Sequence, residues 1–202
     1  MSDTLDLLTL TEAKQAIGTT IAATDLDTTI AAYVTSASRL LDANCGPLVN
    51  RTYTNETHSG GNYTVRLSNN PASTVTTVTE YQGTTAVVLT AETPGVLPDN
   101  AYVLDTPSGY LYRRQGGIDA LWYQGRNNIT VTYTAGRFAS TTTVDARVKQ
   151  AANMLLRHLW AMQYGSGNLM FGEADMPMPI GFAIPNRVKE MLGSYWLVPA
   201  VS

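Results

Sequence analysis

Side chains that commonly act as bases, nucleophiles or metal ligands are few in this chain of 202 residues, which has two histidines and one cysteine. His58 stands beside Ser59 and Gly60 in an expected loop, and as a general base it would need a serine nucleophile and an aspartate partner. No nucleophile-elbow pattern surrounds it, so we interpret His58 as a solvent-exposed loop residue. His158 falls within an expected helix as a partly buried residue, and Cys45 is expected to fill a small apolar space.

The carboxylates also lack the spacings that metal and phosphate chemistry require. No histidine and glutamate lie four residues apart, as a helical zinc site would need. Asp99, Asp105 and Asp119 do not have the spacing of a calcium loop. The glycine pair at 116–117 indicates a turn, without a phosphate-binding pattern around it. The sequence therefore predicts a protein that is not an enzyme, with no cofactor and no metal.

Charge is distributed unevenly along the chain, which has a net charge of −3 and a pI of about 5.3. Residues 1–50 hold six acidic and two basic side chains. Residues 106–160 hold two acidic side chains and seven basic ones, namely Arg113, Arg114, Arg126, Arg137, Arg147, Lys149 and Arg157. We expect Arg113, Arg114 and Arg126 to provide charge at a subunit interface or a channel wall. The alternative is that these are scattered, solvated charges.

Two helices are expected in the first 46 residues. Thr9 and Glu12 form a capping box at the start of a short helix that Gly18 ends. A second helix begins near Asp25, has an apolar residue every three or four positions, and stops at Gly46-Pro47.

Helix returns after a loop at residues 134–143. Apolar residues recur every three or four positions from Val144 to Met162, which predicts one long helix with a continuous buried face. Asp145 and Lys149 are spaced for an ion pair along this helix. A shorter helix is expected from Asn186 to about residue 195.

Between these helical ends the pattern changes to short strands. The 28 threonines of the chain favour β structure, because threonine is β-branched. Seven strands are expected, at 51–56, 63–67, 75–81, 86–89, 102–104, 110–113 and 129–133. We therefore predict an α+β fold, in which a helical bundle built from both chain ends carries an inserted antiparallel β module. The predicted parts are 1–47 (N-terminal helical part), 48–136 (inserted β module) and 137–202 (C-terminal helical part with a long loop and an apolar tail).

Two apolar segments in the last forty residues are candidates for binding a partner. Residues 165–185 are rich in glycine, methionine and proline and include Met170 and Phe171. The last seven residues include Trp196, Leu197 and Val198, which are unfavourable to leave in water. We expect these five residues to contact another protein chain. The alternative is that both segments fold back on their own bundle.

Targeting signals and membrane spans are not expected. The apolar runs are far shorter than the roughly 20 residues of a membrane helix, and residues 1–10 lack a signal-peptide pattern. A single cysteine cannot form an internal disulfide framework. These features predict synthesis in the cytoplasm.

Two parts of the chain carry a family resemblance. The helix that opens with Leu8–Lys14 (LTLTEAK), followed by a helix that an aspartate starts, resembles head–tail connector (adaptor) proteins of long-tailed bacteriophages. So does Ile129–Gly136 (ITVTYTAG) leading into a long helix that contains Val148, Ala151, Ala152 and Trp160. The resemblance covers roughly residues 5–46 and 128–164, with the helix after Ile184-Pro185 matching by position. Relatives often start the long helix with proline, and their β segment is commonly much shorter, which leaves the role of the β module open.

The resemblance implies a structural virion protein of the head–tail connector or head-completion type. About twelve copies would form a ring under the portal protein, continue the DNA channel and join head to tail. The implied partners are the portal protein, neighbouring copies, a tail-side neck or tail-terminator protein, and genome DNA in transient, non-specific contact, with no membrane. The implied location is the virion neck, and the host cytoplasm during assembly. The alternative is a ligand-binding β module, as in a tail or receptor-binding accessory protein, on a helical base.

Overall fold

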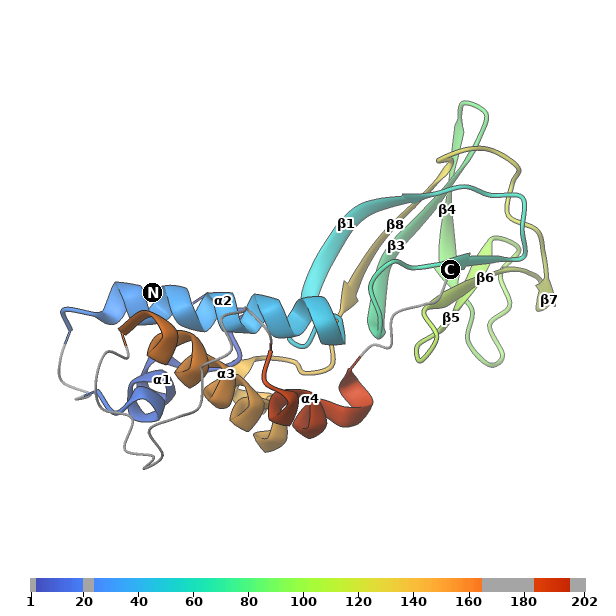
Figure 1. Ribbon diagram of the computed structural model, residues 1–202. Helices are drawn as coiled ribbons and strands as arrows, with labels where there is room; N and C mark the ends of the chain where they lie inside the picture. The colour runs from blue at the N-terminus through green and yellow to red at the C-terminus, as the bar shows by residue number, and fades with distance from the viewer. Residues whose placement is uncertain (1–2, 20–23, 165–183, 197–202) are drawn as a thin grey trace. The chain divides into compact units, whose positions relative to one another are not determined.

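The computed structural model describes residues 3–19, 24–164 and 184–196, and the chain forms two compact units (Figure 1). The helical unit comprises Met1–Leu48 and Phe138–Ser202, and the β unit comprises Val49–Arg137. Helices at both chain ends and a mostly antiparallel sheet between them confirm the expected α+β fold class. Within the ranges described, no helix has the length and apolar character to cross a membrane.

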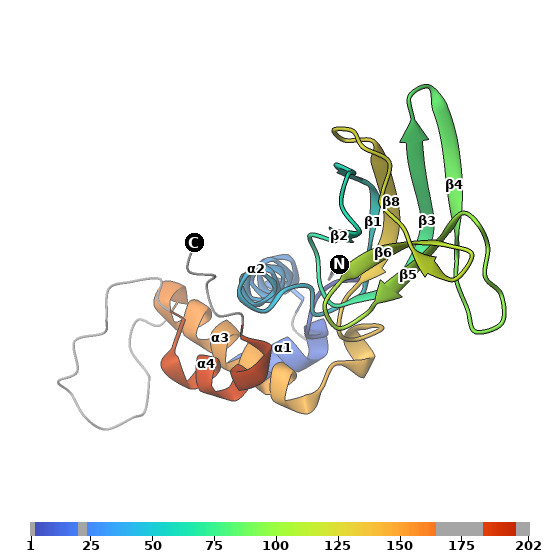
Figure 2. The same ribbon diagram turned by 90° about the vertical axis from the view of Figure 1, so that its right-hand side faces the viewer.

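The helical unit contains α1 (Leu10–Ile17), α2 (Asp27–Cys45), α3 (Ala146–Tyr164) and α4 (Asn186–Leu192), with one-turn helices η1 (Thr141–Thr143) and η2 (Gly193–Tyr195). Figure 2 shows α4 alongside α3. The expected capping box is confirmed at α1, where Thr9 Oγ1 accepts a hydrogen bond from Glu12 N at 3.2 Å and Glu12 Oε2 accepts one from Thr9 N at 2.8 Å. Gly18, with φ of 76°, ends this helix in the left-handed conformation.

The core of the helical unit comes from one face of each helix and from the segment before α1. Its fully buried side chains include Leu7, Leu8, Ala13, Ile30, Val34, Leu41, Val148, Ala151, Leu155, Leu156, Val188 and Leu192. Burying aliphatic side chains in this way stabilises a unit by about 1.5–3 kcal/mol for each one.

Two expectations for α3 were wrong. The buried face is not continuous to its end, because Leu159 is half-buried and Met162 is 41% exposed. The Asp145–Lys149 ion pair is replaced by two other contacts. Asp145 Oδ1 accepts a hydrogen bond from Arg147 N at 2.7 Å, as a cap does, and Lys149 Nζ reaches Glu12 Oε1 at 2.7 Å. Lys149 of α3 therefore pairs with Glu12 of α1, and not with Asp145, which the spacing within one helix had predicted.

The β unit contains β1 (Arg51–His58), β2 (Thr64–Arg66), β3 (Ala72–Gln82), β4 (Thr85–Ala91), β5 (Ala101–Asp105), β6 (Tyr110–Gln115), β7 (Ile118–Asp119) and β8 (Ile129–Ala135). The strand order is β1-β8-β3-β4-β5-β6-β2, with β7 paired to β6. All pairs are antiparallel except β4 and β5, which are parallel at Thr90 and Ala101. The seven expected strands are present. β7 was not expected, because two residues are too few to show an alternating pattern.

The sheet formed by β1, β8, β3 and β4 has two different faces. Along β8, Ile129, Val131, Tyr133 and Ala135 are buried, whereas the threonines between them face the other way. The strand registers place threonines in rows across the sheet, such as Thr57, Thr130 and Thr79, with Val88 at the end of that row. We call this side the threonine face; its members are Thr52, Thr57, Thr74, Thr77, Thr79, Thr130, Thr132, Thr134 and Val88. It carries no charged side chain at these positions.

Candidate functional site

His58 lies in a strand, not in the expected solvent-exposed loop. It is the last residue of β1, its side chain is 14% exposed, and its Nε2 atom is 2.8 Å from Glu56 Oε1. Glu56 also accepts hydrogen bonds from Ser68 N at 2.9 Å and from the Tyr133 hydroxyl at 2.6 Å. The tertiary pairing of β1 with β8 brings Tyr133 to Glu56, whereas His58 and Glu56 lie two residues apart on one side of the same strand.

The Glu56 cluster shifts two titrations. Burial by itself would raise the pKa of Glu56, but the hydrogen bonds from Tyr133 and Ser68 outweigh it and the pKa is lowered. Burial, together with the hydrogen bond to Glu56, raises the pKa of Tyr133 to about 12. Both shifts favour the state in which the neutral Tyr133 hydroxyl donates a hydrogen bond to a charged Glu56. The cluster therefore holds β1, β8 and the loop before β3 together.

Catalytic and metal chemistry finds no further support in the described ranges. Cys45 is buried at the end of α2, and His158 is half-buried on α3. Among the residues that the structure places, no three histidine, cysteine, aspartate or glutamate side chains converge as a metal site would require.

Arg113 is buried inside the β unit, instead of presenting charge to a subunit interface or channel. The residue is 6% exposed. Its guanidinium donates to Asn100 Oδ1 at 2.8 Å and lies 3.6 Å from Glu80 Oε2. Glu80, which is 1% exposed, also accepts a hydrogen bond from Tyr123 N at 2.7 Å. This buried pair orders the loops around β5 and β6, so Arg113 acts within its own subunit.

Arg114 and Arg126 lie in different surroundings from Arg113. Arg114 cross-links three segments, because it contacts Glu92 at 3.2 Å and also bonds to Asp119 and to the Gly117 carbonyl. Arg126 is exposed in the connection before β8. Of the three arginines, Arg126 is the one that the β unit leaves at its surface.

The acidic residues of the first fifty positions are largely engaged within the helical unit. Lys14 Nζ lies 2.5 Å from Asp27 Oδ1, and Lys149 pairs with Glu12. Arg39 pairs with both Asp3 and Asp42. Lys14 and Arg39 belong to the same fifty residues, so their pairs leave the excess of acidic side chains there unchanged, whereas Lys149 comes from the basic segment.

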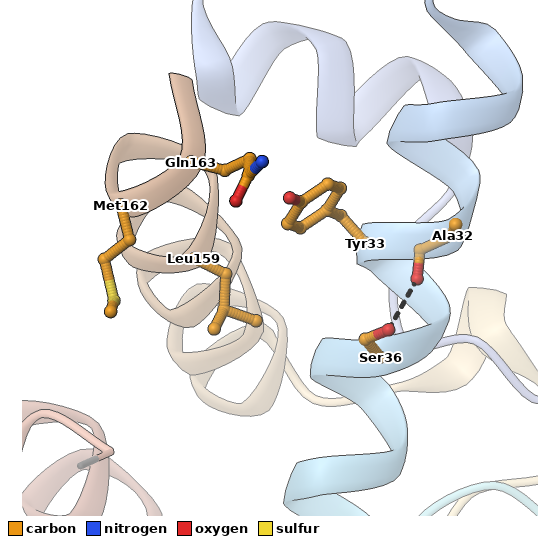
Figure 3. A pocket seen from close by; sticks show the side chains of 6 residues that line it. All are labelled: Ala32, Tyr33, Ser36, Leu159, Met162 and Gln163. Atoms are coloured by element: carbon orange, nitrogen blue, oxygen red, sulfur yellow. Dashed lines mark hydrogen bonds between the residues drawn. The ribbon is translucent and has the colours of Figure 1, made fainter. Parts of the chain in front are cut away.

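A groove of about 390 Å³ lies between α2 and α3 (Figure 3). Its lining residues are Ala32, Tyr33, Ser36, Leu159, Met162 and Gln163. Figure 3 shows Tyr33 pointing from α2 toward Gln163 and Leu159 of α3. At its edge, the ring centroids of Tyr33 and Trp160 are 5.5 Å apart, and those of Trp160 and Tyr164 are 4.4 Å apart. Met162 lines this groove and is exposed, whereas the sequence pattern predicted that it would lie on the buried face of the helix.

The expected partner-binding residues are only partly within the described structure. Trp196 follows η2, is half-buried, and has Lys189 Nζ 5.8 Å from its ring centroid. Met170, Phe171, Leu197 and Val198 lie outside the described residues.

The β unit also exposes aliphatic side chains that sequence reasoning missed. Val96 is 58% exposed, Leu97 is 53% exposed and Ile118 is 72% exposed. The loop that holds Val96 and Leu97 is tied to the β6–β7 turn by a hydrogen bond of 3.1 Å from Gly116 N to Pro98 O. Their position in turn-rich sequence gave no periodic pattern by which to find them.

The family model described as "HCP: Head completion protein" matches residues 6–198. A chain in the structure titled "Neck of empty GTA particle computed with C6 symmetry" has a TM-score of 0.61 at 17% identity, covering 97% of this chain and 92% of that one. A chain from the virion of a native gene transfer agent (GTA) particle gives 0.61 at 18%, with the same coverage. A chain from the neck of a native GTA particle computed with C12 symmetry gives 0.50 at 14%, covering 100% and 98%. At these identities the likeness shows the fold. No curated protein matches the chain.

Proposed function

Because the chain belongs to the head completion protein family, whose members are structural proteins of the virion head–tail junction, we propose that it forms a ring under the portal. In that position the ring would continue the DNA channel and join the head to the tail. The main support for this proposal is the extent of the family match. It covers residues 6–198, which include the whole β unit and most of the helical segments on either side of it. The β unit is therefore part of the head-completion architecture, and the ligand-binding alternative is not favoured.

Ring formation is supported by the fold neighbours. The solved structures of similar fold are described as particle necks computed with C6 and C12 symmetry. A cyclic ring of identical chains needs a head-to-tail interface, in which two different surfaces of each copy meet. We propose about twelve copies, in keeping with a C12 neck.

The proposed partners are the portal protein, neighbouring copies and a tail-side neck or tail-terminator protein. We assign portal or neighbour contacts to Trp196, Leu197, Val198, Met170 and Phe171, because these apolar side chains would gain most from burial against another chain.

Contact with genome DNA is proposed to be transient and independent of sequence. Tight DNA binding requires many phosphates to be neutralised by Lys and Arg. Here Arg113 and Arg114 are engaged inside the subunit, and the threonine face is uncharged. Arg126 is the candidate for charge at an interface or the channel.

Imaging tests the proposal directly. Purified protein is mixed with the portal complex and examined by electron microscopy, with portal alone as the control. We expect a ring beneath the portal, and the protein remaining monomeric and separate from the portal would contradict the proposal. Trp196→Ala should weaken portal or ring binding, whereas Ser194→Ala, an exposed neighbour on η2, should not.

A further inference from the structure

β1 and the hairpin half of β4 are the two open edges of the threonine-bearing sheet. β1 stands at the end of the strand order and pairs only with β8 among the described strands. β4 pairs with β3 from Thr85 to Leu89, while β5 joins it only at Thr90 and Ala91. Figure 1 shows the β3–β4 hairpin extending beyond β5 and β6. The stretch Thr85–Leu89 thus has a strand on one side and none described on the other.

The hairpin geometry shows which backbone groups of β4 face the open side. Gln82 and Thr85 close a two-residue turn, so their pair and every second pair after it exchange hydrogen bonds. Ala86 and Val88 fall between those pairs, and their N–H and C=O groups therefore point away from β3. Thr90 follows Ala86 and Val88 at the same spacing of two residues. Its N–H points away from β3 as well, because it donates a hydrogen bond to Asn100 O at 3.0 Å. Ala86 and Val88 present unused ladder groups to the open side.

Sequence features that normally protect an edge are missing from β4. Exposed edges in soluble proteins usually carry lysine, proline or a bulge, which prevent pairing with another chain. The stretch 85–91 (TAVVLTA) has no charge and no proline, and Val88 is 65% exposed. Such an edge is a ready site for strand addition. β1 does have a bulge, between Tyr53 and Glu56, which restricts the registers in which it can pair.

The two edges match in direction and charge. β1, β8, β3 and β4 alternate in direction, so β4 of one copy placed beside β1 of the next by rotation around a ring is antiparallel to it. On the threonine face, Thr52 and Thr57 of β1 and Val88 of β4 would lie at such a joint, and β4 has no charged residue, so no like charges meet. The two edges differ from each other, as a head-to-tail ring interface requires.

We propose that the open edge of β4 in one copy pairs with the open edge of β1 in the next, joining the sheets into one continuous closed sheet around the ring. This inference rests on the proposed ring. Closure removes every open edge of this kind, as it does in β-barrels. It also places the threonine faces of all copies on the same side of the closed sheet. The high threonine content would then form one continuous uncharged surface of the ring.

Engineered cysteines test the pairing without ambiguity about which chains are joined. In a Cys45→Ala background, Thr57→Cys and Val88→Cys are combined in one chain. Within a chain these positions are three strand spacings apart, roughly 14 Å, whereas disulfide Cα atoms lie within about 7 Å. Any disulfide must therefore join two copies. Thr52→Cys with Val88→Cys samples the alternative stagger.

The expected result is a ladder of covalent oligomers on a non-reducing gel of assembled rings, for one or both cysteine pairs. Val88→Cys alone and Thr57→Cys alone should give none. A covalent dimer from Val88→Cys alone would indicate pairing of β4 with β4 and overturn the proposal. Intact rings in which neither pair forms a disulfide would overturn it too, while leaving the ring itself standing. Failure to form rings at all would instead contradict the proposed function.

Two single proline substitutions in β4 test the same pairing independently, through the concentration needed for ring assembly. Val88→Pro removes an outward N–H, which an edge strand tolerates, and should raise the concentration needed for ring assembly about tenfold or more, equivalent to about 1.4 kcal/mol. Val87→Pro removes an N–H that faces β3 and should unfold the hairpin, which verifies the assignment of direction. A folded Val88→Pro protein that assembles as the unmodified protein does would overturn the proposal.

Discussion

The Glu12–Lys149 pair of the helical unit lies near its surface, whereas the Glu80–Arg113 pair of the β unit lies in the interior. In the helical unit, the Glu12 and Lys149 side chains are 33% and 22% exposed. In the β unit, Glu80 and Arg113 are 1% and 7% exposed. Water solvates the first pair and does not reach the second. Each unit also has a pair of the other kind: Lys14, beside Asp27 in the helical unit, has a side chain that is 5% exposed, and Asp119, beside Arg114 in the β unit, has one that is 61% exposed.

This difference bears on where the molecule can meet its partners. Removing one member of a solvated pair leaves a group that water can stabilise. Removing one member of a buried pair leaves an isolated charge inside the protein. The Glu80–Arg113 pair therefore serves the order of the β unit itself. Besides Arg126, this unit offers other chains uncharged features, namely the threonine face, the open β4 edge and the exposed Val96, Leu97 and Ile118.

The largest effect is expected from Glu80→Ala. The substitution leaves buried Arg113 without its carboxylate and Tyr123 N without its acceptor, so we expect a loss of about 3–5 kcal/mol in the free energy of unfolding. Urea denaturation followed by amide hydrogen exchange would show the loss confined to the β unit. Glu80→Gln keeps an acceptor and should lose less. Equal stability of Glu80→Ala and the unmodified protein would remove the contrast between the units.

High pH should weaken the β unit next. The pKa of Tyr133 is raised to about 12 in the folded protein, from 10.0. A raised folded pKa contributes stability that is present below pH 10 and is lost as the pH rises to 12, which corresponds to about 2–3 kcal/mol. Tyr133→Phe should remove this dependence. Thermal unfolding at pH 8 to 12 checks it, and a helical unit that unfolds first in that range would contradict the prediction.

Acid should act in opposite directions on Asp6 of the helical unit and Glu56 of the β unit. Burial raises the pKa of Asp6 above its usual 3.8, despite hydrogen bonds from Thr35 and Asp3. The cost of this buried carboxylate is therefore relieved as the pH falls through its raised pKa. The pKa of Glu56 is lowered, so its contribution is present above pH 4.5 and is lost as the pH falls through the lowered value. Residue-level hydrogen exchange between pH 6 and 3 should show protection declining in the strands around Glu56, as it should also around Asp3 and Glu12 of the helical unit, whose pKa values are lowered too. Glu56→Gln should abolish the decline in the strands around it, and Asp6→Asn should not.

The smallest effect is expected from Lys149→Ala. Its pair with Glu12 is partly exposed, so the loss should be about 0.5–1 kcal/mol and should shrink in high salt. Arg147→Ala, an exposed position on the same helix, provides the matched control and should be close to neutral. A loss from Lys149→Ala as large as that from Glu80→Ala would mean that the partly exposed pair contributes as much as the buried one and would contradict the comparison.

Local sequence determined the element boundaries and the fold class. Thr9, Glu12 and Gly18 bound α1 because capping uses backbone groups within a few residues. The alternation of Ile129, Val131 and Tyr133 with threonines predicted β8 and its two faces, because side chains in a strand alternate between sides. The layout of these elements also sufficed for the resemblance to head–tail connectors, which the family match confirms.

Tertiary structure alone decided what the charged and titratable residues do. Arg113, Glu56 and Lys149 each meet partners far away in the sequence, at Glu80, Tyr133 and Glu12. A sequence read alone lists charges but not the distances between them, and electrostatic energy depends on distance and burial. The same holds for the open edges, since strand order arises from pairing between distant segments. The alternating pattern could place threonines on one face of β8, but only the order β1-β8-β3-β4 left β1 and β4 as edges.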